Sequence, residues 1–248
     1  MSGVAEWFRW LNSAHGINLS IFYDGFDQRR FVTGIETTLG LSLACVVASF
    51  ALGVLGAWLQ GSRFRLVRAG VRCYVEFFRN TPPLVQLLFF YFGVGALLPT
   101  LPDGSAGGQP LVSNVGWAIV SLSLFAGAHN VEIFRSGIEA VPPAMREAAE
   151  ALGHTRFQIF RLIVFPLAFR ISLPAFNNNL VNLVKTTTLA YAIAVPELLY
   201  ASAQIWSESF NVKEMMNILL FVYLALIALV VWGMGWLERR LRIPGYSV

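Results

Sequence analysis

The sequence predicts an all-α membrane protein with about five transmembrane helices. Of its 248 residues, 56% are hydrophobic and only 13% are charged, whereas about a quarter of the residues in a typical soluble domain are charged. The few charges are clustered between long apolar stretches, although a water-soluble fold would spread them along every amphipathic element. Both observations indicate a chain that faces lipid over most of its surface.

Five apolar stretches are long enough to cross a bilayer, because about 20 helical residues span its ~30 Å hydrocarbon core. Four of them contain no Asp, Glu, Lys or Arg, and the other is interrupted by Lys185 and Glu197. In chain order, the predicted spans are 37–62, 80–102, 104–131, 171–203 and 215–237.

The arginines predict the orientation of these spans. Thirteen basic residues lie within 63–79, 135–170 and 239–242, and only Arg9, Arg29, Arg30 and Lys213 fall on the opposite side. The positive-inside rule places the richer side in the cytoplasm. We therefore expect an external N-terminus and a cytoplasmic C-terminus, which an odd number of spans satisfies.

This topology divides the chain into three parts. Residues 1–30 form an external or interfacial segment, residues 31–242 a single transmembrane domain with a cytoplasmic loop at 135–170, and residues 243–248 a C-terminal tail. Trp7, Phe8 and Trp10 beside Arg9 suit a short helix at headgroup level, and a disordered tail is the alternative. The first residues lack the pattern of a removable signal peptide.

The composition also excludes several functions for the chain acting alone. No Gly-Lys pair occurs, so the sequence has no phosphate-binding P-loop. Cys45, Cys73 and His129 do not have the spacing of a metal or catalytic site. Basic residues clustered between apolar spans argue against nucleic-acid binding. We expect no cofactor, metal or catalytic residue in this chain, and any chemical energy must come from a partner.

Residues 141–153 predict a short helix in the cytoplasmic loop. Pro142 and Pro143 suit its start, good helix formers follow, and Gly153 can end it. Small residues such as Ala148 and Ala149 would let another protein approach closely.

The same loop resembles the signature of bacterial ATP-binding-cassette (ABC) importer permeases. Glu147-Ala148-Ala149 is followed after three residues by Gly153, and after nine more by Ile163, one residue and Phe165-Pro166. The family usually has Leu where Phe165 stands, and Phe keeps the apolar bulk. The resemblance implies a type I importer permease in the bacterial cytoplasmic (inner) membrane, with a coupling helix that docks on an ATPase.

Two further matches narrow the resemblance to permeases for polar amino acids such as histidine, glutamate, glutamine or arginine. One is Glu76-Phe-Phe-Arg79-Asn-Thr-Pro82 followed by Gln86, and the other is the segment 180–190, LVNLVKTTTLA. Arg72, Glu76 and Arg79 would also share one helical face, so an ion-pair ladder at the membrane edge is the structural alternative for part of the first match.

The resemblance implies both a site and a set of partners. Glu147, Ala148, Ala149 and Gly153 would couple the chain to ABC ATPase subunits, which would hold ATP and Mg. A second permease subunit, identical or homologous, would complete the pore within the membrane lipid. An extracytoplasmic solute-binding protein would deliver the amino acid.

A polar stripe in the fourth predicted span is the candidate substrate path. Asn178, Asn182 and Lys185 fall on one helical face, with Asn179 and Thr186 at its margin. For a helix beginning at Pro174, Lys185 would stand about 16 Å along it, near the middle of the bilayer. A charge there is costly, so it usually faces an aqueous cavity or a partner. A structural role, including a permanent pair between Lys185 and Glu197, is the open alternative.

Three other classes of membrane protein are alternatives to an ABC permease. An ion-coupled secondary amino-acid transporter would need inverted repeats, a membrane-embedded enzyme would need a catalytic cluster, and a scaffold subunit would have no water-accessible path. The sequence identifies neither the transported amino acid nor whether the pore is a homodimer.

Overall fold

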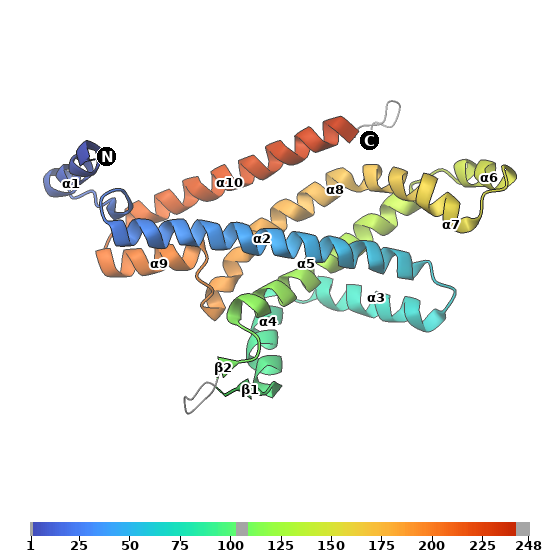
Figure 1. The fold of residues 1–248 in the computed structure, drawn as a ribbon, viewed down its shortest axis with the longest axis horizontal. Helices are drawn as coiled ribbons and strands as arrows, with labels where there is room; N and C mark the ends of the chain where they lie inside the picture. Colours follow the sequence, from blue (N-terminus) through green and yellow to red (C-terminus); the bar gives the residue numbers. More distant parts are fainter. Residues whose placement is uncertain (1, 103–108, 242–248) are drawn as a thin grey trace. The chain divides into compact units, whose positions relative to one another are not determined.

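The structure is a computed structural model that describes residues 2–102 and 109–241. It is almost entirely helical (Figure 1), which confirms the predicted class. A two-residue antiparallel ladder, β1 (Thr100–Leu101) with β2 (Gln109–Pro110), is the one piece of sheet in the described ranges. The tail at 243–248 lies outside the described residues.

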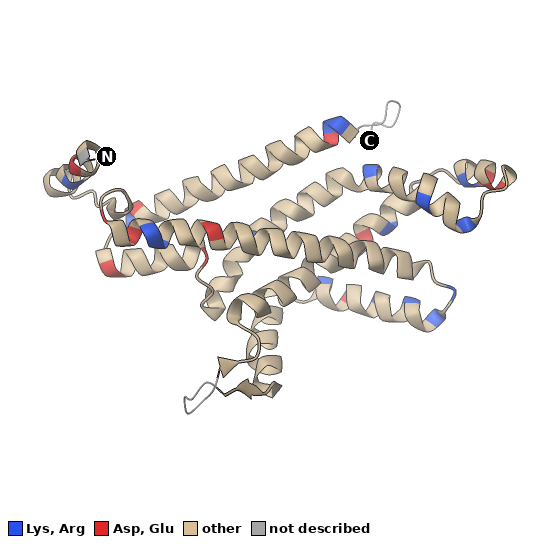
Figure 2. Ribbon diagram, in the orientation of Figure 1, with Lys and Arg blue, Asp and Glu red and all other residues tan. Residues whose placement is uncertain are grey.

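Four helices are long and apolar enough to cross a membrane: α2 (Gly25–Gln60), α5 (Asn114–Glu139), the stretch Arg156–Ile193 that contains α8 (Phe165–Thr186), and α10 (Val212–Leu241). Charged residues stand near the two ends of α10, and its middle is free of them (Figure 2). The shorter elements are α1 (Ser2–His15), α3 (Arg65–Asn80), α4 (Pro83–Leu88), α6 (Pro143–Ala151), α7 (Arg156–Ile159) and α9 (Leu198–Ser209).

The predicted spans differ from these helices in three places. The stretch 80–102 contains a shorter apolar helix of 15 residues, Pro83–Leu97, which rises about 22 Å at 1.5 Å per residue. This helix is not continuous with α3, because Thr81 and Pro82 lie between the two. The third predicted span lies too early, since α5 begins at Asn114 and continues to Glu139. The stretch 171–203 is not one helix, because the chain breaks between Ile193 and α9.

Two compact units make up the fold, and several helices contribute to both. The first comprises Met1–Ala44, Leu84–Ser121 and Val184–Ala228, and the second comprises Cys45–Pro83, Leu122–Leu183 and the chain from Leu229 onward.

In the first unit, α9 lies along the first half of α2 (Figure 1). The Leu198 amide donates to the Thr38 hydroxyl at 3.0 Å. Around this contact, a core cluster joins α2, α9 and α10, and its buried members are Ile21, Phe31, Leu198, Ile205, Met215 and Leu219. The short helix predicted near the N-terminus is present as α1, whose Phe8 ring stacks on Phe22 with centroids 4.5 Å apart.

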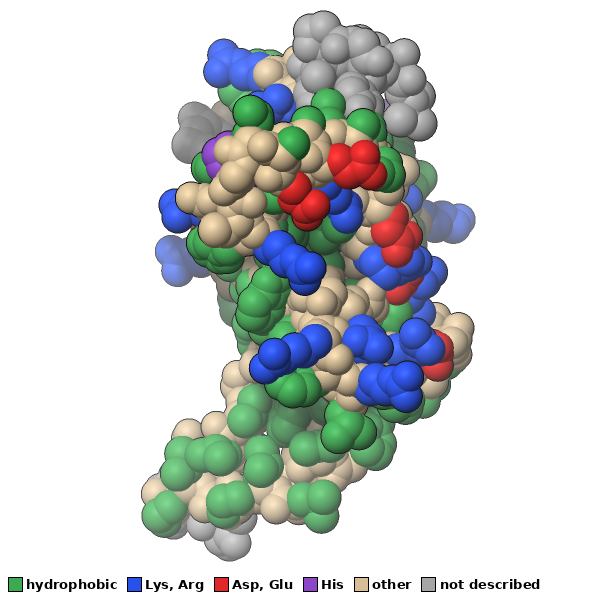
Figure 3. Space-filling model, turned by 90° about the vertical axis from the view of Figure 1, so that its right-hand side faces the viewer, with side chains coloured by type: hydrophobic (Ala, Val, Ile, Leu, Met, Phe, Trp, Pro, Cys, Tyr) green, Lys and Arg blue, Asp and Glu red, His purple; other side chains and the backbone are tan. Residues whose placement is uncertain are grey.

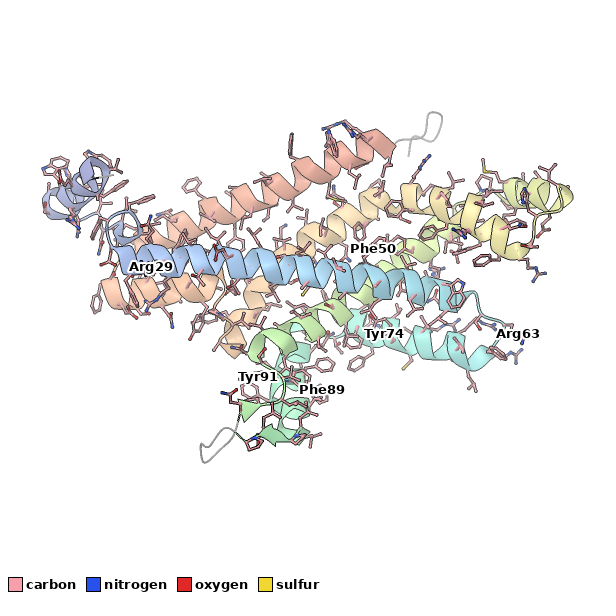
Figure 4. The ribbon with its side chains drawn as sticks, viewed as in Figure 1. Arg29, Phe50, Arg63, Tyr74, Phe89 and Tyr91 are labelled. Atoms are coloured by element: carbon pink, nitrogen blue, oxygen red, sulfur yellow. The ribbon has the colours of Figure 1, made fainter. Side chains whose placement is uncertain are left out.

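In the second unit, α5 is the central helix. The Tyr74 hydroxyl of α3 donates to the Leu124 carbonyl at 2.7 Å (Figure 4), and burial raises the pKa of this phenol, so it remains a donor. On another side, the Asn179 amide of α8 donates to the Asn130 side chain at 2.7 Å. Phe50 of α2, also labelled in Figure 4, makes an edge contact with Phe134 at a centroid distance of 5.3 Å.

Candidate functional site

The candidate coupling segment is the nine-residue helix α6, and its sequence fixes both ends. Pro142 occupies the N-cap and Pro143 the first helical position, where a missing N–H costs nothing. At the other end, Gly153 adopts φ +84°. Its amide donates to the Glu150 carbonyl at 2.9 Å and the His154 amide donates to the Ala149 carbonyl at 3.1 Å, the two bonds of a Schellman motif. The helix predicted at 141–153 is therefore confirmed.

The four predicted coupling residues have different environments. Glu147, Ala148 and Gly153 are exposed, so another protein can reach them. Ala149 is only 3% exposed and belongs to a core cluster with Val141, Ile159, Val164 and Ala168. Ala149 therefore seats α6 on its own chain and is not available to a partner, a distinction that residue type alone did not show.

The loop after α6 forms the support for this helix. Thr155 caps α7 with a reciprocal capping box to Gln158, which fixes the direction in which the chain leaves α6. Ile163 of the family signature packs against the same core cluster as Ala149. The spacing of the signature thus corresponds to one packed unit beneath α6.

Several large apolar side chains around α6 and α7 are exposed, a feature that the sequence analysis missed. Leu152 is 80% exposed and Phe157 68% exposed. Exposed charged residues of both signs, Glu147, Glu150 and Arg156, belong to the same two helices, and Figure 3 shows charged side chains of both signs among apolar ones on the face it presents. An exposed apolar patch rimmed by charges is typical of a protein interaction site.

Arg146 links α6 to the end of α5. Its Nη2 donates to the Ile138 carbonyl at 2.6 Å, one of the last carbonyls of α5, which have no helical partner of their own. Its positive charge also suits the negative end of the α5 dipole.

The second family-like segment spans the junction between α3 and α4. Thr81 is extended, with φ −111° and ψ 142°, as a residue before proline prefers, so α3 ends at Asn80. Glu132 and Arg135 of α5 form an ion pair at 2.8 Å. The ion-pair ladder considered for α3 is not formed within the described chain, because Arg79 lies 3.9 Å from Glu132 instead of pairing with Glu76.

The polar stripe lies on α8, but Lys185 does not stand where we expected. The helix does not begin at Pro174, which lies inside it, so the depth of 16 Å measured from Pro174 is wrong. Lys185 falls in the last turn of α8. The side chains of Asn178, Asn182 and Lys185 are exposed, and Thr186 is half-buried.

Glu197 has a role that the sequence analysis missed. Its side chain is fully buried, and its carboxylate caps α9 by accepting from the Leu199 and Tyr200 amides at 2.9 and 2.8 Å. The Tyr223 hydroxyl donates to the same carboxylate at 3.1 Å. Among the described residues no ion pair joins Glu197 to Lys185, so the proposed permanent pair is not formed.

Comparison with known proteins finds membrane components of transport systems. Residues 49–243 match the family described as "Binding-protein-dependent transport system inner membrane component". The octopine transport system permease protein OccM of Rhizobium radiobacter is 35% identical, with 88% of this chain and 92% of OccM covered. The histidine/lysine/arginine/ornithine transport system permease protein HisM of Salmonella typhimurium is 32% identical, with 86% and 90% covered.

Solved structures show the same fold. An amino acid ABC transporter crystallised with histidines has a chain that superposes with a TM-score of 0.75 and 26% identity, covering 86% of this chain and 94% of that one. The MetNI methionine ABC transporter gives a TM-score of 0.67 at 20% identity, covering 87% and 98%.

Proposed function

Because the chain belongs to the family of binding-protein-dependent transport system inner membrane components, and so is a permease subunit of an ABC importer for polar amino acids, we propose that α6 is its coupling helix. The chain is a multi-pass protein of the bacterial inner membrane and is not itself an enzyme. The capped, exposed α6 is the observation that carries the proposal. We also propose that the stripe on α8 lines the substrate path.

The local geometry supports the coupling role of α6. An isolated nine-residue helix is only marginally stable in water. In α6, however, both ends are capped, and Ala149 packs the inner face of the helix on the core cluster. We therefore expect α6 to stay folded when a partner presses on the exposed Glu147 and Ala148. Apolar contact around Leu152 and Phe157 would add to docking by an ATPase subunit.

The exposure of the α8 stripe supports the path. Two exposed amides and an ammonium on a helix that is apolar enough to cross a membrane are unfavourable against lipid and favourable against water or a polar ligand. Lys185 can bind the carboxylate of an amino acid, and Asn178 and Asn182 can form hydrogen bonds with its polar groups. Thr186 stands at the margin.

The remaining parts belong to partners. ABC ATPase subunits would bind ATP and Mg and move α6, a second permease subunit would close the path, and an extracytoplasmic solute-binding protein would deliver the substrate. ATP-driven closure of the ATPase would then move the permease between inward-facing and outward-facing states. None of the matches described above is to an ion-coupled secondary transporter.

The coupling role is tested with Ala148→Arg, which places a long charged side chain on the exposed face of α6. We expect the variant to lose co-purification of the ATPase and ATP-driven uptake. Ala69→Arg is the matched control, because Ala69 is an exposed alanine of α3. Full co-purification and uptake in Ala148→Arg would contradict the docking assignment. Gly153→Asp is a weaker test, because any side chain strains φ +84°.

The substrate path is tested with Lys185→Met, with uptake and ATP hydrolysis measured separately. We expect the affinity for amino acid in uptake to fall at least tenfold while the ATPase still co-purifies. Uptake with unchanged affinity would rule out an essential contact with the substrate. The amino acid that most stimulates ATP hydrolysis in the purified complex identifies the substrate.

A further inference from the structure

The second unit contains a charged cavity of about 720 Å³. Its walls come from the end of α2, the polar face of α3 and the last turns of α5. Four arginines line it, Arg68, Arg72, Arg79 and Arg135, together with the carboxylates of Glu76, Glu132 and Glu139. The lining therefore carries one net positive charge with His129 neutral. The volume is ample for a ligand the size of an amino acid.

Some of these charges are satisfied by the protein itself. Arg135 bonds to Glu132 at 2.8 Å and to Glu139 at 2.6 Å, so two carboxylates share one guanidinium and the α5 side of the cavity keeps one net negative charge. Arg68 donates to the Ser62 carbonyl at 2.7 Å, which fixes its position without cancelling its charge.

The charges on α3 are not satisfied in this way. Arg79 approaches Glu132 only to 3.9 Å, beyond hydrogen-bonding distance. No ion pair within 4.0 Å involves Arg72 or Glu76 in the part of the chain that the structure describes. Spacings of four and three residues place Glu76 between the two arginines on one helical face. The cavity thus presents cation, anion and cation in sequence.

This pattern selects the chemistry of a ligand. Guanidinium groups bind carboxylates through paired hydrogen bonds, so Arg72 and Arg79 suit carboxylates. Glu76 would repel a purely anionic ligand but would bind an ammonium. A ligand with both groups satisfies all three side chains, and the net positive charge of the lining favours an additional carboxylate.

We propose that this cavity is a second binding site for the transported solute, specific for an α-amino acid that carries a further carboxylate. In this site Arg72 and Arg79 hold the carboxylates and Glu76 holds the ammonium. The inference rests on the proposed function, because its ligand is the transported solute. The orientation predicted from the arginines would put α3 on the cytoplasmic side, so this site would hold the solute as it leaves the permease.

The test measures binding of labelled L-glutamate to the purified permease–ATPase complex in nanodiscs of phosphatidylcholine. The Lys185→Met background removes the contribution of the α8 stripe. We expect saturable binding that Arg72→Gln and Arg79→Gln each weaken at least tenfold. Arg65→Gln is the matched control, because this exposed arginine of α3 does not line the cavity. Absence of saturable binding, or equal weakening by Arg65→Gln, would overturn the proposal.

Competition with glutarate, which lacks the ammonium group, isolates the role of Glu76. The complex should prefer L-glutamate to glutarate, and Glu76→Gln should abolish this preference without preventing assembly. A general loss of structure would not change the preference alone. An unchanged preference would refute the assignment.

Two controls distinguish a solute site from a lipid site and from a failure of the proposed function. If phosphatidylglycerol in the nanodisc displaces L-glutamate from the cavity, the site binds a lipid headgroup and the proposal is wrong. If the complex binds L-glutamate in the cavity but transports no amino acid, the proposed function fails, and the cavity is an amino-acid site that does not serve transport. Transport that persists without binding in the cavity refutes the site alone.

Discussion

Gly137→Ala probes the contact between α5 and α8 on which the seat of α6 depends. A methyl group at Gly137 would lie 2.7 Å from the Ala168 carbonyl oxygen and would collide with the Ser172 hydroxyl. Ser172 is itself committed, because its hydroxyl donates to the Ile133 carbonyl at 3.2 Å. The carbonyl belongs to the backbone of α8 and cannot rotate away, so the two helices must separate.

The magnitude follows from two opposing effects. Overpacking of this kind costs about 1–3 kcal/mol, whereas replacing a helical glycine by alanine gains about 1 kcal/mol. Gly70→Ala on α3 receives the gain alone, since nothing lies within 4 Å of its added methyl group. The two variants should therefore differ in stability by about 1–3 kcal/mol, which corresponds to about 2–4 °C in Tm for each kcal/mol in a chain of this size.

Thermal unfolding of the detergent-purified permease, followed by fluorescence-detected size exclusion, measures this difference. Adding Ser172→Ala to Gly137→Ala should restore part of the loss, because it removes the hydroxyl and leaves the backbone contact. Equal Tm values for Gly137→Ala and Gly70→Ala would refute the close approach of α5 and α8. Uptake should fall with stability in Gly137→Ala, since Ala168 also belongs to the core beneath α6.

Two further pairs of substitutions test other buried contacts. Glu197→Ala should lower the free energy of unfolding by about 1–3 kcal/mol, because it leaves buried donors without an acceptor. Tyr223→Phe should lower the free energy of unfolding by less, since it removes a single donor. The same thermal assay ranks the two variants, and the reverse order would contradict the capping role of Glu197. Ala149→Leu should overfill the core beneath α6 and reduce ATPase co-purification, whereas Ala144→Leu at an exposed position of the same helix should not; equal effects would show that Ala149 is not part of that core.

Local signals in the sequence predicted local structure well. Two prolines, a run of helix formers and a glycine were enough to place α6, because caps and propensities act within a few residues. Long apolar stretches likewise indicated where the apolar helices lie. They could not give the ends of those helices, since apolar composition extends into turns, as at Pro82 and at the break after Ile193.

Tertiary contacts were beyond prediction from one sequence. The sequence predicted that α8 begins at Pro174, but the helix begins at Phe165, because a helix packed in a bundle can tolerate an interior proline. Ala148 and Ala149 are the same residue type in adjacent positions, and only the packing of the loop distinguishes the exposed one from the buried one. The cavity is equally invisible, since its walls combine residues from positions 57 to 139.

The bond between Arg146 and the Ile138 carbonyl determines how a load on the loop would travel. A helix joined to its neighbour only by a flexible chain would swing, and much of an applied displacement would be lost. The guanidinium bonds α6 to the last turn of α5, so we expect the two segments to move together. If an ATPase subunit docks on α6 as proposed, a small displacement of α6 would then be passed on to the membrane helix α5, far from where it is applied.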